Sequence, residues 1–544
     1  MSAAASLPGG RRLLWIAVGL WIAGVSWLNA PRLGYSLWND EEATARSHIV
    51  GRWLEEEDGS VRVERVGWVD TLFSYARPGN HVLYSILARA CHALAPEPVD
   101  AGAAIFSEPL LRLPAFLAGM AALAAMVWVG CVLSCERLGL VAMLLFSLHP
   151  QFTRFTTEAR GYGLLYAFAP LMWAAALKAV ADGRWRWWML LAAASMLSLW
   201  TWPMALHLVL PAQLATLCLI WSTSLPRPDQ WTLVSRWFIT HTLAAMVFLQ
   251  IFLPDLVQLR LFMKGEGSRA VPIDAAWLWD ALCLTFTGSS WKDWNPSNPL
   301  FHCWERVHAV HPAFVWLGGA FLAVLFFAGC FRMLLHHGRR GQILLLAWLG
   351  PVVLIALQGR FGGSVMLPWY FAPALPGLAF TLAAGVEQFL CAFTSEARGG
   401  RLPQAALAGL VCIAFAGMTH TRRQRLREHS MDPNREAALL ARRVLNPWHP
   451  GFAGQALIGG FHMQLDPYAA GMRVIKDLEG LHRCEEEARR QSRACCVIVA
   501  HLEEAAQIQP QVAAELQDEE HWERLGTLWG TEPFFSRTVF RARE

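Results

Sequence analysis

Long apolar segments separated by short polar connections fill the first 420 residues of the chain. A window of about 19 residues, suited to membrane-spanning helices, picks out about eleven of them. They lie near residues 13–30, 110–134, 138–156, 164–181, 187–203, 204–222, 237–255, 312–331, 341–358, 369–393 and 404–420. Each is close to the ~20 residues that a helix needs to cross the hydrocarbon core. The pattern predicts a mainly α fold, a polytopic bundle of about 11–13 transmembrane helices.

Two segments leave the number of spans open. Pro203 is either the turn of a tight helical hairpin or a kink within a longer segment. Residues 81–95 (HVLYSILARACHALA) are too short and too polar for a full span. This second segment therefore either lies along the membrane surface or re-enters the membrane.

Basic residues set the orientation of the bundle. Arg11 and Arg12 precede the first span, which places the N-terminus in the cytoplasm. Counting from there, every cytoplasmic connection is basic, through Arg137, Arg184, Arg186, Arg227, Arg236, Arg332, Arg339, Arg340, Arg398 and Arg401. The outer face then receives the loops 31–109, 256–311 and 359–368, the short connection 156–163, and the tail. The same count places the basic run RRQRLR at 422–427 outside, where basic residues are not expected. We keep this assignment because a long trailing domain is translocated largely regardless of its charge.

The tail from 422 to 544 is hydrophilic and follows a different pattern. Helical periodicity over 431–445, 480–492 and 502–524 alternates with the short apolar runs ALIGGF and CCVIVA. This alternation predicts a small α/β domain. We therefore expect a transmembrane module over 1–421, with its chemistry in the first outer loop 31–109, followed by an extracytoplasmic α/β domain over 422–544.

The composition agrees with a membrane protein. The chain has 544 residues, of which 55% are hydrophobic and 16% charged, whereas a soluble protein carries about 25% charged residues. The 27 Trp residues indicate aromatic belts at the membrane interfaces. The sequence has no dense Lys/Arg run of the kind that binds nucleic acid and no Gly-rich loop for nucleotide phosphates. We expect neither a nucleic acid partner nor a nucleotide cofactor.

The 12 cysteines show no CxxC motif and no Cys/His zinc spacing. Several lie inside apolar segments, where cysteine behaves as a small hydrophobic residue. Cys283 with Cys303, and Cys484 with Cys495 or Cys496, are candidate disulfides if their loops face an oxidising compartment.

Polar side chains gather where the apolar segments meet the outer face. Asp40, Glu41 and Glu42 directly follow the first span, where a membrane anchor would be Lys or Arg. The other members of this group are Arg77, Asn80 and His81 in the first loop, His149, Arg154, Glu158, Arg160 and Tyr162 after the third span, and Arg360, Trp369 and Tyr370 near the tenth. Each one taken singly is explained equally well as a solvated helix end or a structural hydrogen bonder. Their convergence on one side of the membrane favours a functional site.

Such a site suits the transfer of a sugar from a lipid phosphate. The lipid tail needs an apolar groove between helices, and the phosphate needs cationic or N–H donors at the interface. The acceptor hydroxyl needs a carboxylate within hydrogen-bond reach to take its proton. The outer-face residues include both cationic donors and carboxylates.

Four motifs stand in an order that resembles the C-type (GT-C) glycosyltransferase superfamily. They are DE after the first span, NHVLYSIL in the first outer loop, EARGYGLL after the third span and WYFAPALP at a late span. The nearest branch is that of the bacterial protein O-mannosyltransferases and lipid A aminoarabinose transferases (family 39-like), and the resemblance covers about residues 10–390. It implies inversion at the anomeric carbon with polyprenyl phosphate as the leaving group.

The resemblance implies a role for each acidic residue. Asp40 matches the general base that acts on the acceptor hydroxyl, and Glu41 matches the paired acid that orients the acceptor or shares a divalent metal ion. Glu158 matches the second acidic position, and Arg160 and Tyr162 complete its motif. If a divalent metal ion takes part, its implied ligands are Asp40 and Glu158.

The resemblance also implies residues that bind the donor phosphate. Asn80 and His81 match the family's segment near this phosphate, where many members carry Pro-Pro and a basic residue, and Arg77 is the substitute here. The family's late Arg-Tyr pair is Trp369–Tyr370 in this chain. Tyr370 is retained, and Arg360, further up the loop, is the candidate for the missing charge.

We predict a membrane glycosyltransferase, a hexosyl or pentosyl transferase. It moves a sugar from a polyprenyl-phosphate donor to a hydroxyl of a glycan, lipid or protein. The predicted location is the bacterial inner membrane, with the site and the tail facing the periplasm. A lipid-linked glycan ligase shares this donor chemistry and remains an alternative. A lipid or sugar transporter (flippase) would require charges at the bilayer midplane and internal repeats, and a sensor or scaffold whose tail binds a partner is the last alternative.

Overall fold

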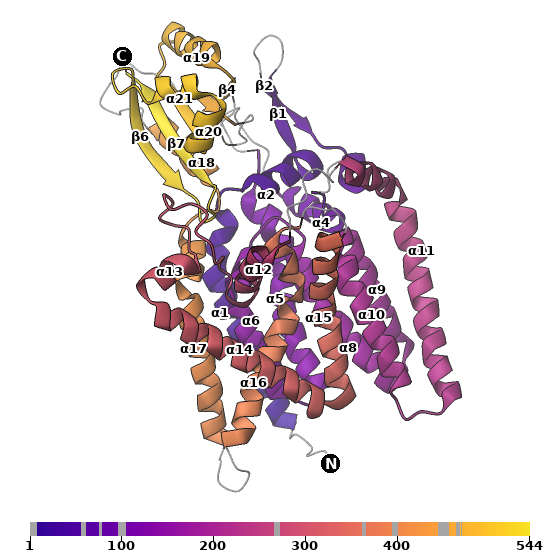
Figure 1. Ribbon diagram of the computed structural model, residues 1–544. Coiled ribbons are helices and arrows are strands. Elements are labelled where there is room, and N and C mark those ends of the chain that lie inside the picture. Colours follow the sequence, from indigo (N-terminus) through magenta and orange to yellow (C-terminus); the bar gives the residue numbers. More distant parts are fainter. Residues whose placement is uncertain are drawn as a thin grey trace.

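The computed structural model describes residues 8–55, 61–75, 79–95, 105–265, 273–361, 366–393, 401–443, 456–463, 468 and 471–543. Arg77, a predicted binding residue, and Arg398, a predicted cytoplasmic residue, lie outside these ranges. Figure 1 shows a helical bundle that carries an α/β domain at one end, with the N-terminus at the opposite end.

Within the described ranges, nine helices are long and apolar enough to cross a membrane. They are α1 (Pro8–Asn29) with η1 (Ala30–Gly34), α5 (Glu108–Val132), α8 (Tyr162–Asp182), α10 (Leu206–Trp221) with η3 (Pro203–Ala205), α11 (Arg227–Gly265), α14 (Pro312–Leu335), α15 (Gly338–Phe361), α16 (Leu375–Phe393) with η5 (Pro368–Ala374), and α17 (Arg401–Glu428). The prediction of a polytopic helix bundle is confirmed, and the chain is an integral, multi-pass membrane protein.

The remaining predicted spans differ in detail. The span predicted at 138–156 is two helices, α6 (Glu136–Ser147) and α7 (Pro150–Thr156). Pro150 disfavours helical geometry at the residue before it, and His149 is extended with φ −77° and ψ 134°. The span predicted at 187–203 is α9 (Trp185–Thr201), which ends before Pro203. Pro203 therefore begins the turn of a helical hairpin between α9 and α10.

The ambiguous segment 81–95 is a short helix, α4 (Val82–His92). Its 11 residues extend only about 16 Å at 1.5 Å per residue, half of the hydrocarbon thickness. The hydroxyl of Tyr84 donates a hydrogen bond to the carbonyl of Leu111 at 2.6 Å, so α4 lies against the start of α5. This end of the bundle, with the C-terminal domain, is the site end.

The rest of the first loop and the second large loop complete the site end (Figure 1). The first loop also forms α2 (Asn39–Thr44), η2 (Ala45–Ile49), the hairpin β1 (Gly51–Glu55) and β2 (Val61–Arg65), and α3 (Trp68–Phe73). The second loop forms α12 (Ala275–Thr287) and α13 (Trp304–Val310). The three consecutive acids lie in α2, which contacts η2, and η2 in turn contacts β1, α3 and α4.

Small residues let the central helices approach closely, as is usual in membrane bundles. A Cβ atom at Gly329 in α14 would lie 1.9 Å from the carbonyl oxygen of Thr381 in α16. A Cβ atom at Gly385 would lie 2.0 Å from the carbonyl oxygen of Leu325. The α14–α16 contact therefore requires glycine at both positions.

The C-terminal domain is a five-stranded sheet with the order β4-β3-β5-β7-β6. The strands β3 (Leu457–Phe461), β4 (Arg473–Ile475) and β5 (Cys495–Ala500) are parallel, and β6 (Trp522–Trp529) and β7 (Ser536–Ala542) run antiparallel at one edge. The helices are α18 (Asn434–Arg443), α19 (Leu478–Arg490), α20 (Leu502–Ile508) and α21 (Pro510–Leu516). α17 continues past residue 421, so the α/β fold begins only with α18.

The sheet separates the candidate cysteines. Successive side chains of a strand point to opposite faces, so Cys495 packs with α19 and Cys496 packs with α18. The Cys484 and Cys495 sulfur atoms are 3.9 Å apart. Cys496 Sγ instead lies 3.6 Å from the carbonyl oxygen of Ala441. Of the two candidate partners of Cys484, the fold favours Cys495.

Candidate active site at one rim of the bundle

The three consecutive acids form the first turn of α2. The chain is extended at Trp38, and the Trp38 N–H donates a hydrogen bond to Glu41 Oε2 at 3.1 Å. This contact satisfies one of the free N–H groups at the start of the helix. Because side chains project in different directions around a helix, Asp40, Glu41 and Glu42 enter three different environments.

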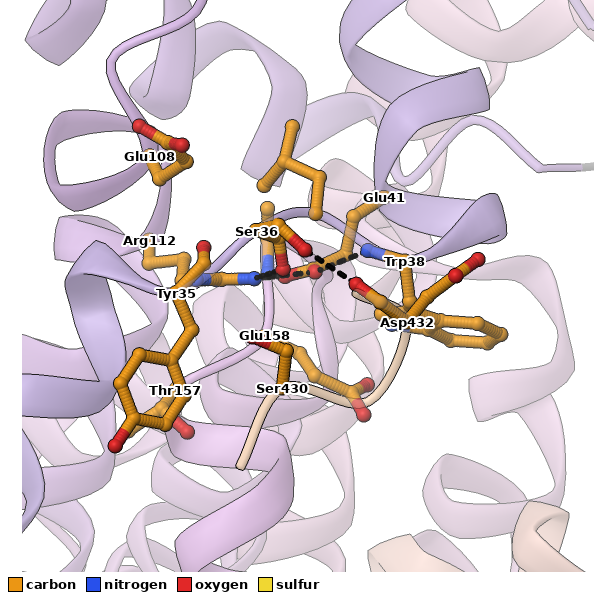
Figure 2. A network of polar contacts seen from close by, with 12 residues as sticks. Tyr35, Ser36, Trp38, Glu41, Glu108, Arg112, Thr157, Glu158, Ser430 and Asp432 are labelled. Atoms are coloured by element: carbon orange, nitrogen blue, oxygen red, sulfur yellow. Dashed lines mark hydrogen bonds and ion pairs between the residues drawn. The ribbon is translucent and has the colours of Figure 1, made fainter. Parts of the chain in front are cut away.

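Glu41 is fully buried and paired with Arg112 of α5 (Figure 2). Arg112 Nε lies 2.8 Å from Glu41 Oε1 and Arg112 Nη2 lies 2.6 Å from Oε2, a bidentate pair. The Ala159 N–H also donates to Oε1. Arg112 Nη2 further donates to the carbonyl of Ser36 at 3.0 Å. Both carboxylate oxygens are thus engaged, and the pair fastens the first loop to the bundle.

Asp40 is the most exposed of the three acids, with 40% of its side chain accessible. Its Oδ2 atom is 3.5 Å from Arg160 Nη1, and the same nitrogen donates to the Asp40 carbonyl at 3.3 Å. Glu42 forms an ion pair with Arg46 one turn along the chain. Asp40 is therefore the acid that an incoming molecule reaches most readily.

The turn between α7 and α8 brings the second acid to the site. Glu158 Oε1 accepts a hydrogen bond from Arg154 Nε at 2.7 Å, while its buried Oε2 has no hydrogen-bond partner among the described residues. Burial, opposed by Arg154, raises the pKa of Glu158 to about 7. Asp40 and Glu158 both interact electrostatically with Arg160, so they belong to one cluster.

His81 is buried against Arg160. The Gly161 N–H points at His81 Nδ1 at 3.0 Å, and Arg160 Nη2 lies 3.2 Å from Nε2. A neutral imidazole accepts at only one nitrogen, so one of these contacts is a hydrogen bond in any tautomer. Burial and the Arg160 charge lower the pKa of His81 well below its usual value, which keeps the ring neutral.

Aromatic rings enclose His81. The ring of Trp202 is stacked on it at 5.8 Å with an interplanar angle of 8°, and Tyr162 meets it edge-on at 5.4 Å. Tyr370 in turn contacts Trp202 at 5.2 Å and 70°. The site thus combines charged groups with an aromatic wall.

The other predicted residues are placed differently. Asn80 donates from Nδ2 to the carbonyls of Thr71 and Ser74, both at 3.1 Å, and accepts from the Ser85 hydroxyl at 2.7 Å. It therefore supports the loop behind His81. Arg360 is exposed at the end of α15, where its guanidinium lies 5.5 Å from the Phe361 ring. In the described part of the chain Arg360 forms no ion pair with the acids.

A groove of about 490 Å³ lies between α10 and α15. Its lining is mostly apolar and consists of Leu206, His207, Leu210, Leu354, Leu357, Gln358 and Phe361. Gln358 Nε2 is 3.8 Å from the sulfur of Met204, and Met204 packs in one cluster with Tyr370. The groove therefore begins beside the aromatic wall of the site.

The tail also reaches the site. The Ser36 hydroxyl donates a hydrogen bond to the carbonyl of Asp432 (Figure 2), and Arg32 Nη1 donates to the carbonyl of Leu426. Arg154 Nη1 pairs with Glu532 at 3.2 Å. The first loop, the α7–α8 turn and the tail thus meet at one place.

Asp40 and Glu158, the implied ligands of a divalent cation, each lie against an arginine. Asp40 faces Arg160, and one oxygen of Glu158 is bound to Arg154. Among the described residues, no group of three His, Cys, Asp or Glu side chains is arranged to hold a metal ion. The described side chains therefore do not fit a divalent cation.

Three residues of the site, Arg112, Trp202 and Glu532, are not among those predicted from the sequence. Arg112 carries a signal in the sequence, because an arginine inside an apolar span requires a partner. Trp202 stands among many interfacial tryptophans, and Glu532 lies in a tail that has many acids. Nothing local distinguishes either of them.

Fold and site together define a multi-pass membrane protein with a buried acid–arginine–aromatic site at one rim of its bundle. No protein-family model matches the chain, and no curated protein sequence matches it. Solved structures are similar over long stretches. ArnT from Cupriavidus metallidurans bound to undecaprenyl phosphate has 13% sequence identity and a TM-score of 0.47, with 98% of each chain covered.

Two further solved structures are similar. The arabinofuranosyltransferase AftD from Mycobacteria has 14% identity and a TM-score of 0.43, covering 100% of this chain and 40% of that one. The oligosaccharyltransferase of Archaeoglobus fulgidus has 13% identity and a TM-score of 0.42, covering 79% and 63%. Likenesses of this degree assign no function to the chain.

Proposed function

We propose that the chain is a membrane glycosyltransferase. It transfers a sugar from a polyprenyl-phosphate donor to an acceptor hydroxyl at the outer face of a bacterial inner membrane, with inversion at the anomeric carbon. The observation that carries the proposal is Asp40, an accessible carboxylate 3.5 Å from a buried arginine at the rim of the bundle. The neighbouring acids Glu41 and Glu42 are paired elsewhere.

Asp40 is the proposed general base. As the acceptor oxygen attacks the anomeric carbon, its proton passes to the Asp40 carboxylate and polyprenyl phosphate leaves from the opposite side. A base in hydrogen-bond reach contributes about 10²–10⁴ in rate. Glu41 acts indirectly, since its pair with Arg112 fixes the turn from which Asp40 projects.

Arg160 is the proposed contact for the donor phosphate. Its Nε atom is buried and has no hydrogen-bond partner among the described residues, and the same holds for Trp38 Nε1 and Glu158 Oε2. Buried polar atoms without partners are costly, so a bound ligand with phosphate oxygens and sugar hydroxyls would satisfy them. Fixed donors at the leaving phosphate ease its departure. His81, Tyr162 and Tyr370 form the wall beside this phosphate, with Asn80 holding the loop of His81, and Arg77 remains a predicted contact.

The apolar groove between α10 and α15 is the proposed path of the prenyl chain. It begins beside Tyr370 and is lined mostly by aliphatic residues. Arg360 follows the groove residue Gln358 at the end of α15, so we assign it to the lipid side of the donor rather than to the reacting carbon.

The test is the release of polyprenyl phosphate, which requires no knowledge of the sugar or the acceptor. The protein is assayed in vesicles of its native membranes, prepared with the periplasmic contents retained so that donor and acceptor are both present, and the released carrier is measured by mass spectrometry. We expect Asp40→Asn to reduce release by about 10²–10⁴. Glu64→Gln, which alters an exposed ion pair of the same loop, serves as the matched control and retains release.

The mass of the released carrier also separates the alternatives. A transferase of the proposed kind releases the monophosphate, a ligase acting on a diphosphate-linked glycan releases the diphosphate, and a transporter releases neither. Equal release by the wild type and Asp40→Asn would remove Asp40 from the mechanism.

A further inference from the structure

The tip of the β6–β7 hairpin, residues 530–535, lies on the transmembrane module. Asn298 Nδ2 donates to the carbonyls of Gly530 and Glu532 at 3.1 and 2.9 Å. Arg422 Nη1 donates to the Thr531 carbonyl at 2.7 Å. A Cβ atom at Gly530 would lie 1.9 Å from the carbonyl oxygen of Met431, so the close approach requires glycine there. Three separate elements therefore hold the tip in place.

The tip presents one carboxylate to the site. Glu532 Oε1 is 3.2 Å from Arg154 Nη1 and is also paired with Arg422 Nη2. Arg154 in turn binds Glu158 through Nε at 2.7 Å. A single buried guanidinium thus joins a carboxylate of the tail to a carboxylate of the candidate active site.

A second contact from the tip reaches the start of α2. The ring of Phe535 lies 5.9 Å from the ring of Trp38, and the guanidinium of Arg154 lies 5.7 Å from the centroid of the same Trp38 ring. Trp38 immediately precedes the turn that carries Asp40. The residue that precedes the turn of Asp40 and the arginine that binds Glu158 therefore both contact groups of the C-terminal domain.

We propose that the C-terminal domain completes the active site, with Glu532 as a positioning residue that holds Arg154 against Glu158. The consequence for sugar transfer rests on the proposed function, but the coupling between the two carboxylates does not. Without Glu532, Arg154 keeps one acidic partner among the described residues, Glu158, and loses its ion pair with the tail.

The charged groups around Glu158 and Glu532 determine the direction in which loss of Glu532 shifts the pKa of Glu158. The charged groups that interact with Glu158 are Arg154, Glu41, Arg160 and Arg32. Those that interact with Glu532 are Arg422, Arg154 and Arg32; burial raises the pKa of Glu532, but these cations outweigh burial and lower it overall. Removal of the Glu532 charge leaves the positive charge of Arg154 less compensated, which lowers the pKa of Glu158.

The first test is a double-mutant cycle on thermal unfolding of the purified protein. We expect Glu532→Gln and Glu158→Gln to be non-additive by about 1–2 °C, because both bind Arg154. Glu523→Gln, which lies on the same hairpin and pairs with Arg541, is the matched control and is additive with Glu158→Gln. Additivity of Glu532→Gln with Glu158→Gln would overturn the inference.

The second test measures release of polyprenyl phosphate as a function of pH. We expect Glu532→Gln to shift the part of the pH–release profile that Glu158 governs to lower pH, by about half a unit or more. We expect Glu523→Gln to leave this part of the profile unchanged. If the wild type releases no carrier, the proposed function fails while the unfolding cycle still decides the role of Glu532. An active Glu532→Gln variant with the same pH–release profile as the wild type would contradict the positioning role.

Discussion

At the scale of single residues, the partner of each acid decides what that acid does. Asp40, Glu41 and Glu42 share one helical turn, yet Glu41 is locked to Arg112 while Asp40 keeps an accessible carboxylate. Removing Arg112 would leave Glu41 as a buried charge without its partner, a situation that costs about 3–5 kcal/mol. The pair is therefore a condition for the fold of the first loop.

Glu158 makes a pH-dependent contribution to stability. Its pKa is raised to about 7 by burial from an ordinary value of 4.5. Between those two values the folded state binds more protons than the unfolded state, so this group lowers stability as pH rises through this window.

We expect the melting temperature of the wild type to fall more steeply from pH 5 to pH 7.5 than that of Glu158→Gln. Asp432, whose pKa burial raises to about 6, titrates in both proteins, so the difference between the two curves isolates Glu158. Parallel curves would mean that Glu158 is ionised throughout this range.

The sequence predicts which residues gather at the site, but not which of the three consecutive acids stays accessible. Asp40, Glu158, Arg160, His81 and Tyr162 were selected because they end on one side of the membrane, and the structure gathers them in one cluster. Which member of the acidic triplet stays accessible depends on Arg112, which is 71 residues away from Glu41. A local pattern carries no information about a partner at that distance.

At the scale of elements, breaks in helices create the site. Pro150 interrupts the predicted third span, and Pro203 begins the turn after α9, which places Trp202 beside His81. Apolar periodicity located these segments but not their breaks, because a proline can either kink a membrane helix or end it. The packing of neighbouring helices selects between the two outcomes.

The pairing of α19 with β5 gives a prediction about cysteines. Mild oxidation with copper–phenanthroline should link Cys484 to Cys495, since their sulfur atoms are 3.9 Å apart and a small rotation of each side chain brings them to bonding distance. Peptide mass spectrometry identifies the link. The link should persist in Cys496→Ser and vanish in Cys495→Ser. A Cys484–Cys496 peptide would contradict the placement of these residues on opposite faces of the sheet.

At the scale of the whole molecule, the order of apolar segments and basic loops was sufficient for the class of fold. Nine helices in the described ranges satisfy the length and hydropathy of a span, because the bilayer imposes both on any helix that crosses it. The docking of the tail was not predictable. It depends on single contacts such as that of Asn298 with Gly530, and such contacts produce no periodic pattern in the sequence.

The predicted orientation has a direct test. A tag after Glu544 should be reachable by a membrane-impermeant reagent in intact spheroplasts, and a tag at the N-terminus should be reachable only after permeabilisation. The basis is the basic character of the opposite loops and the position of the sheet away from the N-terminus (Figure 1). Labelling of the C-terminal tag only from the cytosol would contradict this orientation.

The contacts of Ser36 with Asp432 and of Arg32 with Leu426 join residues separated by 396 and 394 positions. During biosynthesis these two residues of the first loop therefore have no partner until the segment that contains Leu426 and Asp432 has left the ribosome. A nascent chain that stalls before Leu426 would carry a bundle whose site end lacks both contacts, and under the proposed function such a chain would be inactive.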